Sequence, residues 1–473
     1  MIAEVKNIID GCIKRSATIQ RYMSEFGSLT LDEYIYRQRQ KLAANNRLTP
    51  MQDGEDFISI CAGYVSERLG AEYGSLVKEA LRTKALHTAD HLGGLYTPQS
   101  FQGDLLFARL TGAKCIPCFA AGSVTLHSST YGRGIQYFSK KEEIGKIPLF
   151  PGKYAKHSAS LVKGIDEAAI NRGLKSAASI EHAGILDRVT DILGNIYLDR
   201  QLLEQERFAD QAIRIGAGIF EDLGEPFSKT PLIHIETEEV SGRLFIRDVK
   251  DKSSLVHRIL YNKELVSRMG RLRERLFRGN DQKGHMFSLK LCEDGFLRGS
   301  TIYNENYAIS ADPDTLCEAI SDRQIFISAY LRALMLAFAR GFTWYGGSFQ
   351  SSYLRQWQIE TVSALRLAGE ETIASYIESF ETDGYISGPI FAMFDTGAGA
   401  TPAGPVEFGI QSISEEQLDK CMKHVKVYEA HVMGMFEFYY DLFLADERID
   451  GWYGKLASFE KDNHSDSCIM LGS

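Results

Sequence analysis

The stretch "HTADHLGGLYTPQSFQGDLLFARLTGAKCIPCFAAG", residues 87–122, decides the fold. Residues 98–112 have a proline at the first turn and a glycine near the end, a pattern that predicts a helix. The apolar run within residues 110–126 predicts a buried strand. A polar, glycine-containing loop precedes the helix. The order loop, helix, buried strand is typical of a parallel sheet covered by helices.

The rest of the chain repeats this alternation, and we divide it into three regions. Residues 1–85 have helical apolar spacing and form an N-terminal helical segment. Residues 86–360 are expected to form a Rossmann-like α/β core, with long helices inserted at about 183–222. Residues 361–473 are mixed and then helical. Within the core, "FISAYLRALMLAFARGFTWYGG" (326–347) predicts one long apolar helix that stops at a glycine pair.

Composition and charge exclude several classes of partner. The 473 residues include 62 acidic and 53 basic ones, a net charge of −9, which argues against nucleic acid. No apolar run is long enough to cross a bilayer, so we expect no membrane partner. The eight cysteines are widely spaced, and the first residues show no basic segment followed by an apolar one. We therefore expect free thiols and a cytoplasmic protein.

The start of the deciding stretch has two interpretations, of which the first is a metal site. On a helix, His87 and His91 would lie one turn apart with Asp90 beside them, and such a group suits Zn or Fe. A contribution from Cys115 and Cys118 is disfavoured, because residues three apart on a strand face opposite sides.

The second interpretation is a ligand pocket. Gly93 and Gly94 allow backbone to approach a ligand closely, and the amides that open the following helix favour an anion. Gln99 and Gln102 lie in the first turns of that helix. The loop matches neither the P-loop nor the dinucleotide fingerprint. The sequence thus identifies no cofactor, although a nucleotide is among the anions that such a loop can take.

Several segments occur in an order that resembles the bacillithiol synthase family. The segments are "ADHLGGLY" (89–96), "CIPCF" (115–119), "LCEDGFLRG" (291–299), "DPDTLCEAI" (312–320), "RALM" (332–335) and "GGSFQSSY" (346–353). The resemblance covers about residues 75–360, discontinuously. It implies a Rossmann-like fold and an enzyme that adds an amino acid, cysteine in that family, to a small molecule.

The chain departs from the family pattern at three places, one of which is that the family's long C-terminal coiled coil is not evident. The acidic and histidine-containing strand end of the family is replaced by "AAGSVTLHSSTYGRG", where His127 is the nearest substitute. The glutamate of the glycine turn is missing, and Ser348 or Gln350 takes its place. The departures put the substrate and the chemistry in doubt more than the fold.

We therefore expect a small-molecule biosynthetic enzyme of ligase or transferase type, which joins an amino acid or other nucleophile to a polar, anionic metabolite. Asp90, His91 and His127 are the expected catalytic residues, with Asp90 and His91 orienting or deprotonating the nucleophile. The expected substrate-binding residues are Gly93, Gly94, Gln99, Gln102, Arg133, Arg332, Gly347 and Tyr353. The alternatives are a metal-dependent hydrolase or oxygenase using His87, Asp90 and His91, and a non-catalytic helical interaction protein. A homodimer is left open.

Overall fold

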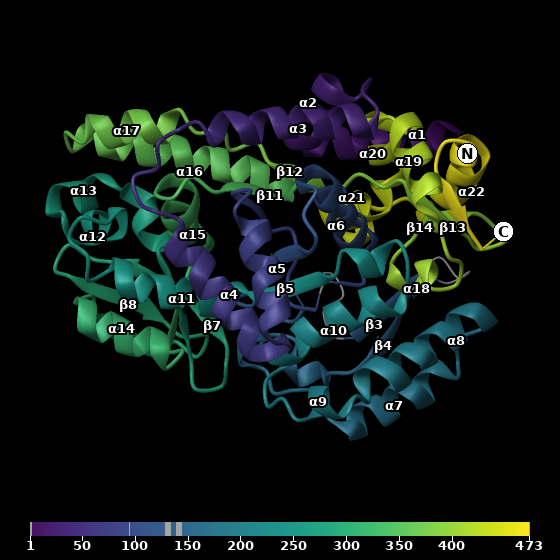
Figure 1. Cartoon of the computed structure of the whole chain (residues 1–473), viewed down its shortest axis with the longest axis horizontal. Helices are drawn as coiled ribbons and strands as arrows, with labels where there is room; N and C mark the ends of the chain where they lie inside the picture. Colours follow the sequence, from purple (N-terminus) through teal and green to yellow (C-terminus); the bar gives the residue numbers. More distant parts are fainter. Residues whose placement is uncertain (1, 94, 128–133, 139–143, 473) are drawn as a thin grey trace.

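The chain folds into a mixed α/β structure, in which helices surround a parallel sheet (Figure 1). The computed structural model describes residues 2–93, 95–127, 134–138 and 144–472. The helices that precede the second strand are α1 (Ile2–Arg15), α2 (Ala17–Phe26), α3 (Leu31–Asn45), α4 (Glu55–Leu69), α5 (Ala71–Leu81) and α6 (Pro98–Thr111).

The central sheet has five strands, and every neighbouring pair is parallel. Its spatial order is β12-β11-β1-β2-β5. Numbered by their order in the chain, the strands therefore lie in the order 5-4-1-2-3. Their bounds are β1 (Ala85–His87), β2 (Ile116–Ala120), β5 (Leu232–Glu236), β11 (Thr343–Gly347) and β12 (Tyr385–Ser387). The predicted parallel, helix-covered sheet is confirmed.

The deciding stretch forms the elements that its pattern predicts. Helix α6 begins at Pro98 and ends at Gly112, which has a left-handed φ of 64° that suits glycine. In β2 the side chains alternate between two cores: Cys118 packs into one, while Phe119 packs into the other together with Cys115. The prediction that Cys115 and Cys118 diverge is confirmed.

One expected helix is wrong, and the correction matters for the sheet. Residues 326–347 form strand β10 (Ile325–Ile327), helix α15 (Ala329–Ala333) with a π-helical turn to Phe338, and strand β11. The glycine pair thus ends a strand and not a helix. An apolar run does not by itself distinguish a buried strand from a buried helix, and β11 is buried except at Gly347.

A second, antiparallel sheet with order β10-β6-β7-β8-β9 lies at the left of Figure 1. Its other strands are β6 (Phe277–Asn280), β7 (Met286–Leu291), β8 (Phe296–Ser300) and β9 (Asn306–Ser310). The helices between residues 160 and 330 are α7 (Glu167–Ala177), α8 (Ala183–Asp191), α9 (Arg200–Leu203), α10 (Phe208–Asp222), α11 (Thr237–Asp248), α12 (Leu255–Tyr261), α13 (Lys263–Arg268) and α14 (Pro313–Ser321). A hairpin of β3 (Gly134–Phe138) and β4 (Ile144–Pro148) packs near α18 (Pro405–Phe408) and α7.

The C-terminal region returns to the N-terminal helices, and both chain ends lie on the same side (Figure 1). Ion pairs that link these regions include Glu4 with Lys455 and Arg15 with Glu447. Strands β13 (Ala392–Asp395), β14 (Ala400–Pro402) and β15 (Ile469–Leu471) form a small sheet. The helices are α16 (Ser348–Leu367), α17 (Glu371–Glu378), α18 (Pro405–Phe408), α19 (Glu415–His424), α20 (Val427–Met433), α21 (Met435–Leu442) and α22 (Trp452–His464).

Two hydrophobic cores lie on the two faces of the parallel sheet. Helices α3 and α6 and the C-terminal region contribute to one core, and α4, α5, α11 and the segment 255–380 contribute to the other. Residues 1–85 thus supply both cores. The expected boundaries at residues 85 and 360 stay predictions.

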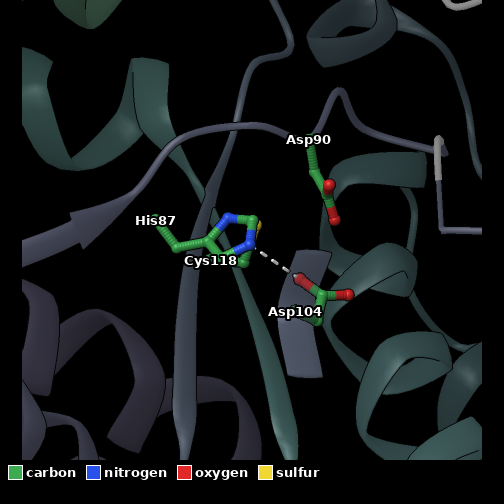
Figure 2. Close-up of side chains that lie close together, drawn as sticks. All are labelled: His87, Asp90, Asp104 and Cys118. Atoms are coloured by element: carbon green, nitrogen blue, oxygen red, sulfur yellow. Dashed lines mark hydrogen bonds and ion pairs between the residues drawn. The ribbon is translucent and has the colours of Figure 1, made fainter. Parts of the chain in front are cut away.

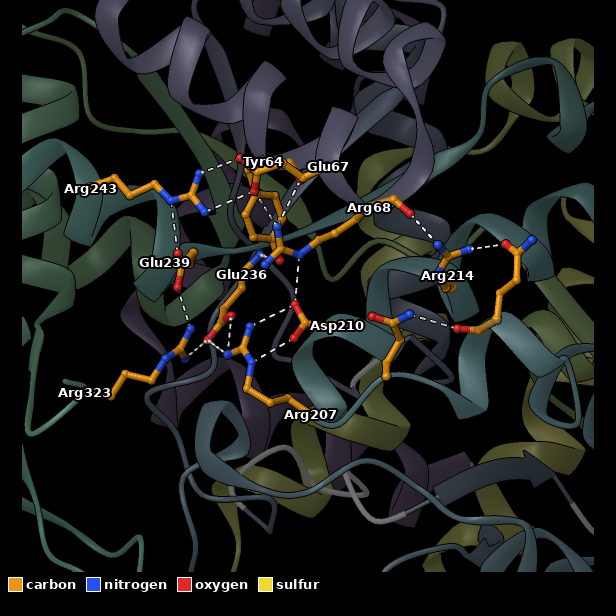
Figure 3. Close-up of polar contacts among 12 residues, drawn as sticks. Tyr64, Glu67, Arg68, Arg207, Asp210, Arg214, Glu236, Glu239, Arg243 and Arg323 are labelled. Carbon is orange, nitrogen blue, oxygen red and sulfur yellow. Dashed lines mark hydrogen bonds and ion pairs between the residues drawn. The ribbon is translucent and has the colours of Figure 1, made fainter. Parts of the chain in front are cut away.

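An ion-pair network fixes the far edge of the parallel sheet, around Glu236 at the end of β5 (Figure 3). The fully buried Glu236 carboxylate accepts hydrogen bonds from Arg207 at 3.1 Å and Arg323 at 2.9 Å. Arg207 also pairs with Asp210 on α10, which in turn pairs with Arg68 on α4. The carboxylates of Glu236 and Asp210 already neutralise the charges of these arginines, so their role is structural: they link α4, α10 and β5.

No helix in the described ranges has the length and apolar character that a membrane crossing requires.

Candidate active site

The strand order creates a crevice beyond the carboxyl ends of β1 and β11. These two strands are neighbours, but β2 and β5 follow β1 to one side while β12 follows β11 to the other. Chain connections leave such a point in opposite directions, so open α/β sheets bind ligands there. Two cavities lie at this edge of the sheet.

The first cavity has a volume of about 330 Å³ and is called the acidic cavity here, since Glu437 and Asp441 of α21 place two carboxyl groups in its wall. Its lining contains no lysine or arginine among the described residues. The other lining residues that the argument uses are Thr88, His91, Gln99, Gly347, Gln350 and Tyr353.

The second cavity, of about 220 Å³, is called the basic cavity because Arg275, Arg278 and Arg332 line it. No aspartate or glutamate is among its described lining residues. It lies between the parallel sheet and the antiparallel one, since Arg278 is on β6 and Arg332 is on α15.

Four residues line both cavities and therefore mark their junction: Thr88, His91, Gln350 and Tyr353. Thr88 and His91 follow β1, and Gln350 and Tyr353 lie on α16, which starts directly after β11. The Thr88 hydroxyl donates to Gln350 Oε1 at 2.9 Å, and this hydrogen bond links the segment after β1 to α16 across the crevice. The two cavities thus have opposite charge and meet at the switch in strand order.

His91 is the titratable group best suited to proton transfer at this junction. Burial lowers its pKa and outweighs the nearby carboxylates of Asp90 and Glu238, so the neutral ring is favoured. Its backbone is held by the bridge between His91 and Ala121 at the end of β2. Tyr353 is complementary, because burial raises its pKa to about 12 and keeps its hydroxyl protonated. A neutral imidazole accepts a proton, and a protonated phenol donates one.

The Arg332 guanidinium is held in the wall of the basic cavity by Glu238 on α11. Arg332 Nη1 donates to Glu238 Oε1 at 2.7 Å, and the Gly122 amide donates to Glu238 Oε2 at 2.7 Å. Burial raises the pKa of Glu238, but Arg332 and the donors at Ser123 and Gly122 lower it by more than burial raises it. The net pKa is therefore lowered, and the carboxylate stays charged. Arg332 is thus buried, paired with Glu238 and part of the cavity wall.

In the acidic cavity, burial and the neighbouring Asp441 raise the pKa of Glu437 well above its ordinary value. Two carboxyl groups one helical turn apart disfavour each other's charge. A cation bound between them would reverse this effect, because it stabilises both carboxylates. The cavity therefore favours a ligand with an ammonium group.

The structure separates the residues that the sequence proposed for the site. His91, Gln99, Arg332, Gly347 and Tyr353 line the two cavities, and their roles at the site stay predictions. His127 is exposed and is absent from both linings, so it does not join the others. Gly93 lines a separate cavity of about 20 Å³. Gly94 and Arg133 lie outside the described residues.

The assignment of Gln102 to the substrate is corrected. Its amide is fully buried and makes four hydrogen bonds with backbone: the nitrogen donates to Ala392 and Ala403, and the oxygen accepts from Phe391 and Ala392. The donors and the acceptor of the Gln102 amide are therefore all used in hydrogen bonds that hold α6 against β13. Gln99, three residues earlier, makes one long bond of 3.4 Å to Gly434 and stays at the cavity wall.

Asp90 also requires a correction, because it is fully buried and lines neither cavity. It belongs to a buried cluster with His87, Asp104 and Cys118 (Figure 2). A hydrogen bond of 3.0 Å from His234 holds Asp90 and helps lower its pKa to about 2, although burial opposes this. Two of the three expected metal ligands are in the cluster, and His91 is not.

Sequence reasoning missed the charged walls of both cavities. Glu437 and Asp441 lie one helical turn apart within the apolar helix "MFEFYYDLF". Two acidic residues on one face of an apolar helix are a pattern from which this wall could have been predicted. Arg278 lies within the basic run "RMGRLRERLFRGN" (268–280), a pattern typical of a solvated helix face, and only the folding of β6 against β10 brings it to the cavity. Gln350 was noted only as a substitute for a missing glutamate.

No protein-family model, curated protein or solved structure matches the chain.

Proposed function

We propose that this protein is a small-molecule biosynthetic enzyme of ligase or transferase type, which joins an amine-bearing nucleophile to an anionic acceptor. The observation that carries the proposal is the meeting of an acidic and a basic cavity at His91. A cavity pair of this kind suits two polar substrates of opposite charge, since each wall attracts one of them. An amino acid is the expected nucleophile, in line with the resemblance to bacillithiol synthase.

The proposed fold of the core is Rossmann-like. The strand order, read from the β5 edge, is 3-2-1-4-5 in chain order, which matches the first five strands of the doubly wound order 3-2-1-4-5-6 of dinucleotide-binding sheets. The support is the topology of the sheet and the position of both cavities at its switch point. The order supports the fold and the place of the site, but it does not identify the substrate.

In the proposed reaction, Glu437 and Asp441 bind the ammonium group of the nucleophile, and Arg278 and Arg332 bind the anionic group of the acceptor. The attacking group is a second, neutral group of the same molecule, such as the thiol of cysteine, because the ammonium nitrogen has no lone pair; it gives its proton to the neutral His91 ring as its new bond to the acceptor carbon forms. The leaving group of the acceptor departs with the electron pair of the broken bond. Tyr353 is placed to donate a proton to that group.

The metal-dependent hydrolase or oxygenase is less well supported as a function. An ion held by His87 and Asp90 would lie in the buried cluster and not in a cavity wall, so a substrate would not reach it. A non-catalytic interaction protein would not need two cavities of opposite charge at the switch point.

The proposal is tested first by binding. The unfolding temperature is measured with the twenty amino acids and with a set of phosphorylated and carboxylated sugars. A ligand at a hundred times its Kd adds about 2.7 kcal/mol, and this raises the unfolding temperature of a chain of this length by about 3 °C. The proposal expects at least one stabilising compound from each set.

Variants then assign each compound to a cavity. Arg278→Gln should weaken the anion at least tenfold and leave the amino acid unchanged, while Glu437→Gln should do the reverse. Arg298→Gln is the matched control, because this exposed arginine pairs with Asp294 away from both cavities. Equal effects of all three variants, or no stabilising compound in either set, would overturn the proposal. His91→Gln should retain binding of both and lose product, followed by mass spectrometry.

A further inference from the structure

In one buried cluster, four side chains with metal-binding atoms converge. They come from four places: His87 ends β1, Asp90 follows it, Asp104 is on α6 and Cys118 is on β2. One donor atom of each lies within 4.8 Å of the donor atoms of the other three. All four residues are fully buried.

The cluster contains buried polar atoms without hydrogen bonds. Within the described part of the chain, His87 Nε2, Asp90 Oδ1 and both carboxylate oxygens of Asp104 have no hydrogen-bond partner. His87 Nε2 and Asp104 Oδ1 lie 3.1 Å apart as an ion pair, but not with the geometry of a hydrogen bond. A buried polar atom without a partner is costly, and such atoms call for an explanation such as an ion. Here three neighbouring residues of one buried cluster, His87, Asp90 and Asp104, carry such atoms.

The geometry points to a divalent transition-metal ion, Zn²⁺ by its donor set, bound by His87, Asp90, Asp104 and Cys118. One imidazole, two carboxylates and one thiolate are ligands that Zn²⁺ takes, and four of them make a closed tetrahedral site. Zn²⁺ bonds of about 2.0–2.3 Å place ligand atoms about 3.3–3.8 Å apart, so the cluster needs a modest contraction.

Neighbouring groups already orient the ligands. His234 Nε2 lies 3.0 Å from Asp90 Oδ2, and this leaves Oδ1 as the oxygen available to an ion. The His87 Nδ1 atom is close to Ala89 N at 3.4 Å, and Nε2 lies 3.1 Å from Asp104 Oδ1, so Nε2 is the ring nitrogen directed at the carboxylates. Such outer contacts are a regular part of metal sites, because they fix the ligand orientation.

The ion would be structural and separate from the proposed catalysis. None of its four ligands lines the acidic or the basic cavity, and a closed four-ligand site has no position for substrate. It would join β1, β2 and α6, directly beside Thr88 and His91. The inference does not depend on the proposed function, and either can fail alone.

The test uses the full chain, purified without added metal and analysed for its metal content by mass spectrometry. The expected result is about one Zn²⁺ per chain. The metal is then removed with a chelator and replaced with Co²⁺, which in a tetrahedral site with a thiolate gives visible bands and a sulfur-to-metal band in the near ultraviolet.

Three variants make the result specific. Cys118→Ser should abolish the sulfur band and keep the visible bands, and Asp104→Asn, which preserves shape, should weaken Zn²⁺ about a hundredfold. Cys115→Ser is the control, because Cys115 lies on the other face of the sheet and should change neither. The inference is overturned if the native chain takes up neither ion, or if it binds Co²⁺ without a sulfur band. It is equally overturned if Cys115→Ser removes that band.

Discussion

The separation of Gln99 from Gln102 gives a prediction whose size follows from the structure. Both glutamines lie on the first turns of α6 and are buried, but one amide meets a cavity and the other meets backbone. Gln102→Met keeps the length of the side chain and removes four hydrogen bonds, to Phe391, Ala392 and Ala403. At about 1 kcal/mol each, their loss costs about 4 kcal/mol of unfolding free energy.

The matched control is Gln99→Met. It removes one long bond to Gly434, worth at most about 1 kcal/mol, and places a thioether in the wall of the acidic cavity. Urea denaturation followed by circular dichroism measures both variants. The expected order is a much lower midpoint for Gln102→Met and a nearly native one for Gln99→Met. Equal midpoints would refute the claim that Gln102 is a structural tie.

Three further predictions concern buried charges. Arg340→Met should cost about 3–5 kcal/mol in urea denaturation, because it leaves the buried Asp248 carboxylate without the guanidinium that it pairs with at 2.7 Å. Glu238→Gln should cost about 3 kcal/mol, and adding Arg332→Met should recover part of this, since the second change removes the unpaired charge. Burial lowers the pKa of His431 to about 4, so the unfolded state binds a proton at a higher pH than the native state does. The free energy of unfolding should therefore fall by about 3 kcal/mol as the pH falls from 7 to 4. Denaturation curves of His431→Phe should lack this part of the pH dependence.

The local elements of the site were predictable, and their long-range partners were not. Helix α6 and strand β2 were predictable because Pro98, Gly112 and the apolar run act within a few residues. Strand β11 was missed, since the run before Gly346 is equally apolar in a helix or a strand. That strand leads into the helix that brings Gln350 and Tyr353 to the junction. Without it, the sequence did not predict which residues line the crevice.

The buried cluster shows the same limit. His87 and Asp90 attracted a metal interpretation from their spacing alone, but the third and fourth donors come from Asp104 on α6 and Cys118 on β2. Cys118 reaches His87 because β1 and β2 pair in register at these two residues. Register between parallel strands depends on the connection between them, and a single sequence does not reveal it.

Calorimetric titration of an amino acid, with and without a saturating anionic sugar phosphate, tests the two-cavity account most directly. The amino acid and the sugar phosphate are those that stabilise the protein most. Because the two ligands would occupy adjoining cavities of opposite charge, the account predicts that the amino acid binds in both titrations, with a Kd that stays the same or falls when the anion is present. Displacement of the amino acid by the anion, or binding of both to one shared site, would contradict it.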